Sequence, residues 1–295
     1  MKRPLPTQIR YALEALGLSI LLLIFKIMPA HWASNIGGWV GRNIGSRLAA
    51  SRKARRNLER ALPDLSEQRK DEIIAGMWDN LGRVMAEYPH LETLALDYTD
   101  IEGEEHMRIG LENPRGAIFF GAHFGNWEIN TIAALTQFDE KVAPTYRAPN
   151  NPWSDKLLMR TRTLNGTLDA HSKSRQGGKG MIDDLKAGKS LGILIDQKYN
   201  EGVSVPFFGL EAMTNPFFVQ LAQKYKASLV PLCNRRLDNG RFSLTFYPAL
   251  EVMNKDCSAR AVDEVIKDAH SLLEEWIEDK PEQWLWLHRR WKDDV

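Results

Sequence analysis

Cysteine is nearly absent from this 295-residue chain, which contains only Cys233 and Cys257. There is no CxxC pair and no metal-ligand spacing around either residue. A disulfide framework and a structural zinc site are therefore not expected, and such sparse cysteine is typical of a reducing compartment. Each cysteine is predicted to be a small buried apolar residue. No metal and no redox cofactor is implied.

An overall excess of charge is also missing, because the formal net charge is only +1. The total gives no support for nucleic-acid binding. One local exception is a basic run in which Glu59 is the only acid; its basic residues are Arg42, Arg47, Arg52, Lys53, Arg55, Arg56 and Arg60. The run is either a solvated helical face or a surface that attracts anionic lipid headgroups. A nucleic-acid arm is less favoured because no aromatic residues interleave with the charges.

The chain lacks a long uninterrupted apolar segment. Eleven uncharged, mostly apolar residues run from 15 to 25, Lys26 interrupts them, and the uncharged stretch resumes from 27 to 41. A spanning helix needs roughly 20 apolar residues, and no clear signal-peptide cleavage site follows the apolar stretch. We expect an uncleaved N-terminal anchor that either enters one leaflet or spans marginally. Basic residues on both sides leave its orientation open.

The remaining pattern predicts an α/β fold, with a mixed, mostly parallel sheet covered by helices. Ser66 is expected to cap a helix, and residues 1–62 are predicted to form a helical membrane-associated region before a domain at 63–295. Buried strands are predicted at 117–121, 141–146, 190–196 and 228–232. Helices are predicted at 126–137, 152–165, 178–187, 216–225 and from 258 to about 280. Residues 238–240 (DNG) favour a hairpin turn, which makes the sheet mixed.

His123 follows the predicted strand 117–121, and Gly125 permits a tight turn before a helix near Asn126. Sites in open α/β sheets gather at the carboxyl ends of strands, and helix N-termini favour anions. Histidine is the natural general base near neutral pH. It suits proton removal from a hydroxyl that attacks a thioester. The competing interpretation is a buried structural histidine.

Two carboxylates compete as the partner of His123. Glu128 is close in sequence, but side chains five positions apart meet only if the chain turns at Gly125. Otherwise Glu128 serves the positive end of a helix. Asp196 ends the predicted strand 190–196 and reaches the same sheet edge if the strands are parallel, although it is equally suited to capping a loop. Amides near Gly125 and Asn126 are candidates for facing an oxyanion.

Four ordered segments carry a resemblance to a known family. Residues 121–128 (GAHFGNWE) resemble the H-x4-D/E motif of the lysophospholipid acyltransferase superfamily, in particular the late acyltransferases of bacterial lipid A synthesis. Residues 146–152 (YRAPNNP), 205–214 (VPFFGLEAMT) and 281–292 (PEQWLWLHRRWK) resemble further segments of that family in the same order. The sequence departs from many members at 215–216 (NP). The resemblance spans almost the whole chain.

The resemblance implies a glycerol-3-phosphate acyltransferase-like fold in which His123 is the catalytic base and Glu128 its paired acid. It also implies O-acyl transfer from an acyl carrier protein to a hydroxyl of a lipid A precursor. The setting would be the cytoplasmic face of the bacterial inner membrane, among membrane lipids. Transfer onto another membrane glycolipid or lysolipid, a thioesterase-like hydrolase and a non-catalytic membrane scaffold are the alternatives.

The resemblance also suggests substrate contacts. Arg147 and Arg175 lie on matching segments and suit phosphate groups, and Arg162 is a weaker candidate of the same kind. The alternative for each arginine is a surface charge. Residues 176–180 (QGGKG) lack the spacing of a phosphate-binding loop and favour a loop that enters a helix. An acyl pocket lined by Phe207, Phe208, Phe217 and Phe218 is considered, although core packing is favoured for most of them.

Overall fold

The computed structural model describes residues 4–291. The α-helices that follow residue 62 are α4 (Glu67–Glu87), α5 (Leu91–Asp97), α6 (Glu104–Leu111), α7 (Asn130–Phe138), α8 (Pro152–Arg162), α9 (Arg175–Lys186), α10 (Phe217–Tyr225) and α11 (Val262–Asp279). The N-terminal part holds α1 (Leu5–Ile27), α2 (Ala30–Val40), a π-helical turn (Gly41–Gly45) and α3 (Ser51–Ala61). As expected, the Ser66 side chain caps α4, where it accepts a hydrogen bond from the Arg69 amide.

The centre of the fold is a seven-stranded sheet in the order β1-β9-β8-β2-β5-β3-β4. Its strands are β1 (Thr99–Glu102), β2 (Ala117–Gly121), β3 (Val142–Tyr146), β4 (His171–Ser172), β5 (Ser190–Leu194), β8 (Ser228–Arg236) and β9 (Phe242–Phe246). Every neighbouring pair is parallel except β8 and β9, which are joined through the turn at 238–240. The prediction of a mixed, mostly parallel sheet with a hairpin is confirmed.

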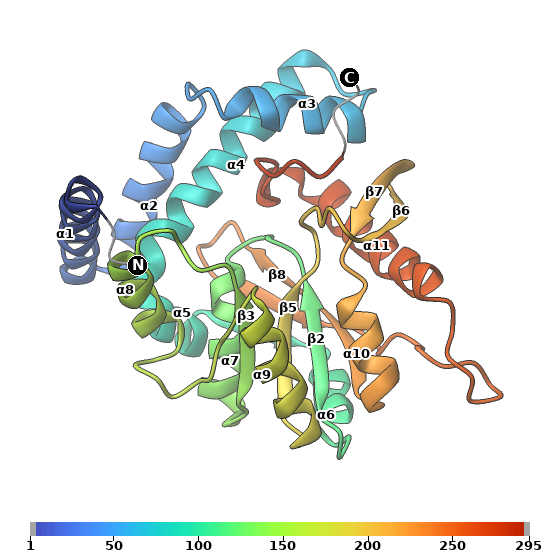
Figure 1. Cartoon of the computed structure of the whole chain (residues 1–295). Coiled ribbons are helices and arrows are strands. Elements are labelled where there is room, and N and C mark those ends of the chain that lie inside the picture. Colours follow the sequence, from blue (N-terminus) through green and yellow to red (C-terminus); the bar gives the residue numbers. More distant parts are fainter. Residues whose placement is uncertain (1–3, 292–295) are drawn as a thin grey trace.

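Alternate residues of the buried strands face two cores. On β2, Ile118 and Phe120 belong to a core shared with α9, α10 and α11, while Phe119 belongs to a core shared with α5, α6 and α7. Side chains on a strand alternate in this way because the repeat along the chain is two residues. Helices therefore cover both faces of the sheet (Figure 1).

A small separate hairpin, β6 (Val203–Phe207) and β7 (Leu210–Thr214), packs against α11. Its turn places Phe208 and Gly209 at φ values of 53° and 69°. Glycine takes such left-handed backbone angles without strain, which explains its place in the segment VPFFG. Phe207 and Phe218 are buried in the core with α11, and Phe208 and Phe217 pack against that core. The favoured core role of these four side chains is confirmed.

The N-terminal helices α1, α2 and α3 differ in how closely they pack against the rest of the protein. Ala54 and Leu58 of α3 share the core of β2, so packing is continuous across the predicted boundary at residue 62. Helix α2 lies along α4, where a Cβ on Gly82 would come within 2.1 Å of the Gly37 carbonyl oxygen. Helix α1 lies outermost, beside α8 (Figure 1). In residues 4–291 it is the one helix long and apolar enough to cross a membrane, judged by length and composition alone.

Some predicted boundaries were wrong. The helix expected at 126–137 begins with a 3₁₀ turn, Trp127–Ile129, because its entry runs out of the Gly125 turn. Helix α9 begins at Arg175, capped by Ser174, so residues 176–180 lie inside the helix and do not form a loop. Helix α11 starts at Val262 and not at 258. Cys233 is buried as expected, but Cys257 is exposed.

Candidate active site

The site is built at the carboxyl ends of two neighbouring parallel strands. β2 ends at Gly121 and β5 ends at Leu194, and the Ile195 amide still donates to the Gly121 carbonyl at 3.0 Å. His123 and Asp196, each two residues beyond the end of its strand, therefore emerge side by side. Gly125 then turns the chain at φ 57°, where a Cβ would come within 2.1 Å of the Asn234 carbonyl oxygen. The predicted turn at Gly125 is confirmed, and only glycine fits it.

Asp196 is the carboxylate that contacts the His123 ring. Its Oδ1 lies 2.7 Å from His123 Nδ1, and its Oδ2 accepts the His123 backbone amide at 3.0 Å. The indole nitrogen of Trp284 donates to the same Oδ2 at 2.8 Å. Burial alone would raise the pKa of Asp196, but the adjacent His123 ring and its hydrogen bonds hold that pKa well below the ordinary range. Asp196 is therefore an ionised, fully buried acceptor for Nδ1–H.

The opposite ring nitrogen of His123 faces a cavity. Nε2 lies 3.2 Å from the side-chain amide nitrogen of Gln197, which also lies 2.9 Å from Nε2 of His288. Both histidines line the cavity. An imidazole with Nδ1–H held by a carboxylate and Nε2 directed into a cavity is arranged as a general base.

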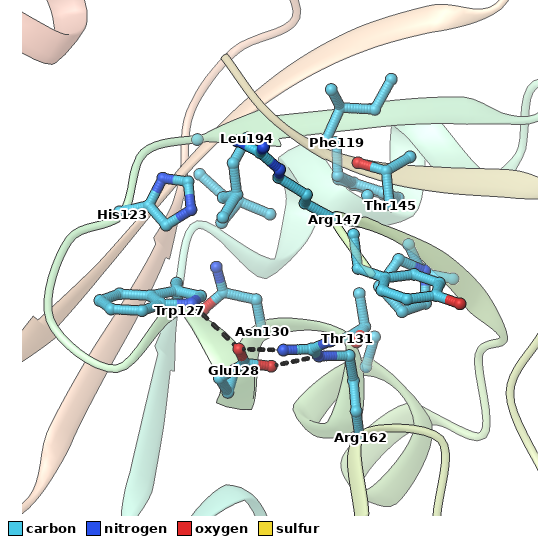
Figure 2. Close-up of a pocket in the computed structure, with 18 of the residues that line it drawn as sticks. Phe119, His123, Trp127, Glu128, Asn130, Thr131, Thr145, Arg147, Arg162 and Leu194 are labelled. Atoms are coloured by element: carbon cyan, nitrogen blue, oxygen red, sulfur yellow. Dashed lines mark hydrogen bonds and ion pairs between the residues drawn. The ribbon is translucent and has the colours of Figure 1, made fainter. Parts of the chain in front are cut away.

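Glu128 points away from the His123 ring, into an ionic cluster with Arg162 and Tyr88 that also lines the cavity. Arg162 donates two hydrogen bonds to its carboxylate, both at 2.6 Å, while the Tyr88 hydroxyl and the Trp127 indole donate at 2.7 and 3.1 Å. Figure 2 shows Trp127 between the His123 ring and this ion pair. Burial alone would raise the pKa of Glu128, but Arg162 lowers it below its ordinary value. Within residues 4–291, Glu128 makes no hydrogen bond to His123.

Asn126 lies outside the cavity. Its side-chain amide nitrogen donates to Glu87 at 2.7 Å, and its backbone amide donates to Asn234 Oδ1 at 3.2 Å. The Gly125 amide donates to the Gln283 carbonyl at 3.1 Å. Because these donors are already used inside the fold, the expectation that the amides of Gly125 and Asn126 face an oxyanion was wrong.

The cavity has a volume of about 380 Å³ and lies between the sheet and α7. Its polar mouth holds His123, Gln197 and His288. Arg147, Lys173, Glu128 and Arg162 also line the cavity, and the largest share of the lining is apolar, including Met85, Met107, Phe119, Ala134, Val142, Leu232 and Phe246. The considered pocket lined by Phe207, Phe208, Phe217 and Phe218 was wrong, because the hairpin and α10 lie against the other face of the sheet.

The three predicted arginines differ in position. Arg147 is exposed at the end of β3, lines the cavity and makes no ion pair within the described residues (Figure 2). Arg162 also lines the cavity, but Glu128 and Tyr88 already occupy its guanidinium. Arg175 starts α9 on the surface and does not line the cavity. Of the three, only Arg147 has a guanidinium open to a ligand in the cavity.

Sequence reasoning missed Gln197, His288 and Trp284 as residues of the site. Trp284 and His288 belong to the segment 281–292, which reaches the site because the Leu285 amide donates to the His123 carbonyl at 3.1 Å. Gln197 directly follows Asp196, and this adjacency was the available signal. Residues 4–291 contain no group of three or more His, Cys, Asp or Glu side chains that could hold a metal ion.

Comparison with known proteins gives a consistent result. The profile of the family described as bacterial lipid A biosynthesis acyltransferase matches residues 3–293. A lipid A biosynthesis lauroyltransferase of Escherichia coli (strain K12) is 30% identical, covering 96% of this chain and 92% of the relative. A lipid A biosynthesis palmitoleoyltransferase of the same organism is 27% identical with the same coverage. A lipid A biosynthesis acyltransferase of Haemophilus influenzae is 24% identical over 92% of this chain and 85% of the relative.

Proposed function

The chain belongs to the family of bacterial lipid A biosynthesis acyltransferases, and we propose that it moves a fatty acyl group from acyl carrier protein to a hydroxyl of a lipid A precursor with His123 as general base. The observation that carries the proposal is the Asp196–His123 pair, in which Nε2 of the histidine opens into a largely apolar cavity. We assign Asp196 as the acid that orients the ring. We assign Glu128 to the ionic cluster behind Trp127.

In the proposed reaction, the acceptor hydroxyl gives its proton to Nε2 of His123 as its oxygen attacks the thioester carbonyl carbon. Asp196 stabilises the imidazolium that forms, because its carboxylate is ionised and bonded to Nδ1. Collapse of the tetrahedral intermediate breaks the carbon–sulfur bond. The leaving thiolate then takes the proton from Nε2, which restores the neutral ring.

The cavity suits the substrates by its chemistry. A fatty acyl chain fits the apolar space beyond His123, since burying each CH₂ group contributes about 0.8 kcal/mol. Arg147 and Lys173 line the polar part of the cavity and suit phosphate groups of the acceptor or of the phosphopantetheine arm.

The acidic carrier protein is proposed to dock beside the cavity on α3. The Asn57 side chain of α3 donates to the backbone carbonyls of Trp286 and His288, which places this basic helix next to the site. Arg52 and Arg56 are exposed on it one helical turn apart. Charge reversal at both positions should raise KM for the acyl carrier thioester and leave KM for the lipid acceptor nearly unchanged.

We propose that the protein binds the cytoplasmic face of the inner membrane through α1 and the outer face of α2. Large exposed apolar side chains cover most of α1 and continue along α2, the π-helical turn and the residues just after it as Trp32, Ile36, Trp39, Val40, Ile44 and Leu48. Trp32, Ile36, Val40, Ile44 and Leu48 recur every four residues, and Trp39 lies three residues after Ile36, so these positions form one face. Exchange of Trp39 for glutamate should release the protein from anionic vesicles, whereas exchange of Trp153, exposed on α8, serves as the comparison variant.

The function is tested by His123→Ala. General-base catalysis typically contributes 10²–10⁴-fold, so transfer to the lipid A precursor should fall by about that factor while the protein still folds. His106→Ala on α6, outside the cavity lining, is the matched control and should retain full activity. Near-normal transfer by a folded His123→Ala protein would contradict the proposal.

The competing functions predict different products. A thioesterase would release free fatty acid at full rate without any lipid acceptor. An enzyme for another glycolipid would prefer that lipid in assays with purified acceptors, and a scaffold would keep its cellular role after His123→Ala. Loss of one specific secondary acyl chain from the lipid A of a deletion strain, measured by mass spectrometry, would support the proposal.

A further inference from the structure

Gln197 lies at the point where a hydroxyl must approach the base. Its side-chain amide nitrogen is 3.2 Å from His123 Nε2 and 2.9 Å from His288 Nε2. The two imidazole rings lie next to each other, with their centroids 5.2 Å apart. The other end of the amide, Oε1, accepts from the ammonium group of Lys173 at 3.4 Å.

The partners of Gln197 fix which way its amide points. Lys173 is a donor only, so the group that faces it must be the amide oxygen. The amide nitrogen then faces the two imidazoles and has two hydrogens, one for each ring. Each Nε2 must therefore carry a lone pair and no proton. For His123 this is the same tautomer that Asp196 demands from the other side of the ring, because a carboxylate at Nδ1 accepts a proton there.

His288 is suited to remain an acceptor for the Gln197 amide. Burial lowers the pKa of His288 to about 4, helped by its neighbours His123, Lys173 and Lys53 and opposed by Asp196. At neutral pH the ring is therefore neutral and its Nε2 stays available to the Gln197 amide. The ionisable side chains around the pair are Asp196 after β5, Lys173 after β4, Arg147 after β3 and Lys53 on α3.

We propose that Gln197 is a positioning residue that keeps Nε2 of His123 unprotonated until the acceptor hydroxyl replaces its amide, and that His288 holds this amide in orientation. The inference rests on the proposed role of His123 as base. A donor at Nε2 disfavours the imidazolium, so the base stays ready at rest. The amide occupies the place where a hydroxyl hydrogen has to point, and substrate entry moves it aside.

Gln197→Glu tests the inference because it keeps the shape of the side chain and reverses its polarity. A carboxylate beside Nε2 accepts a hydrogen bond and favours the protonated ring, so the pH at which His123 loses its proton should rise by about one unit. Transfer should then fall by up to about tenfold on the acid side of neutral pH and recover as the pH is raised. Gln197→Met removes the donor without adding an acceptor and should give a smaller shift. His288→Phe, which frees the amide to turn, should shift the profile in the same direction as Gln197→Glu.

The measurement that does not depend on activity is the reaction of the His123 ring with diethyl pyrocarbonate as a function of pH. Modified peptides that contain His123 and His288 are counted separately by mass spectrometry on the full chain in detergent. A purely structural role predicts that the isosteric Gln197→Glu is the mildest variant and leaves the profile in place. That result would overturn the inference.

The role of Gln197 and the proposed function can be refuted separately. A wild-type protein that transfers no acyl group, yet shows the shifted His123 profile in Gln197→Glu, would refute the proposed function and support the tautomer assignment. Transfer that requires His123, together with an unmoved profile in Gln197→Glu, would refute the role of Gln197 and leave the proposed function standing.

Discussion

Asp196 and Glu128 are two buried carboxylates near the segment 123–128, and they differ in the side chains to which they are hydrogen-bonded. Asp196 bonds to a histidine whose second nitrogen opens into the cavity. Glu128 accepts hydrogen bonds from Arg162, Tyr88 and Trp127, and none of these three donors is a histidine. Both acids are held ionised by their partners.

We therefore expect Asp196 to act in the reaction and Glu128 to stabilise the fold. A buried carboxylate next to a neutral, titratable ring can stabilise a charge that appears during a reaction. A carboxylate already neutralised by a permanent guanidinium has no such charge to receive. Removal of the first acid should therefore change the reaction rate, and removal of the second should change the stability of the fold.

The largest effect is expected for Asp196→Asn. The replacement amide presents donor hydrogens toward His123 Nδ1, which favours the tautomer with the proton on Nε2 and removes the base. Acyl transfer should fall on the order of 10³–10⁴-fold in kcat with little change in KM. Steady-state kinetics checks this, with circular dichroism as the control for folding. A variant within tenfold of wild type would remove Asp196 from the mechanism.

Glu128→Gln should act on stability. Loss of the carboxylate leaves Arg162 buried without its counter-charge, which costs roughly 3–5 kcal/mol in buried ion pairs. Urea unfolding should show this loss, while kcat of the folded protein should stay within about tenfold of wild type.

The double variant Glu128→Gln with Arg162→Met is the matched control. An apolar side chain in place of the buried arginine removes the uncompensated charge and should recover most of the lost stability. If Glu128→Gln instead abolishes turnover at unchanged stability, Glu128 and not Asp196 is the acid on which the histidine depends.

Local pattern predicted the strand that precedes His123 and the turn at Gly125, because both depend on neighbouring residues. The same reasoning left Glu128 and Asp196 as alternatives, since the choice depends on which strands are adjacent. β2 and β5 are neighbours although about 70 residues separate them. His288 and Trp284 were beyond local reasoning because they come from the far end of the chain and contact the site through tertiary packing.

A smaller effect is expected at a third buried cluster, which is formed by His270 and Arg290 and contains no acid. His270 accepts from Arg290 at 2.9 Å, and burial together with that cation lowers the pKa of His270 to about 3. Since the unfolded chain binds the proton first, stability should be lost as the pH falls below about 6.5 toward about 3. Between pH 7 and pH 5 we expect a loss of about 2 kcal/mol from this residue.

Urea unfolding of wild type and His270→Gln at both pH values measures that loss, and the variant should show a flatter dependence. The Asp196 contribution falls in a different window, because a carboxyl with a lowered pKa loses its stabilising effect only below the ordinary value of 3.8. Equal slopes for the two proteins would mean that His270 is not neutral in the fold.

The smallest effect is expected on KM and concerns the three arginines predicted to contact substrate. Arg147 is open to the cavity, Arg162 is paired with Glu128, and Arg175 lies on the surface outside the cavity lining. A charge-assisted contact to phosphate is worth about 1.5 kcal/mol, so Arg147→Gln should raise KM for a phosphorylated lipid acceptor roughly tenfold and leave kcat in place. Arg175→Gln, the matched surface variant, should leave both constants unchanged. A rise in KM for Arg175→Gln alone would move the phosphate contact out of the cavity and onto the start of α9.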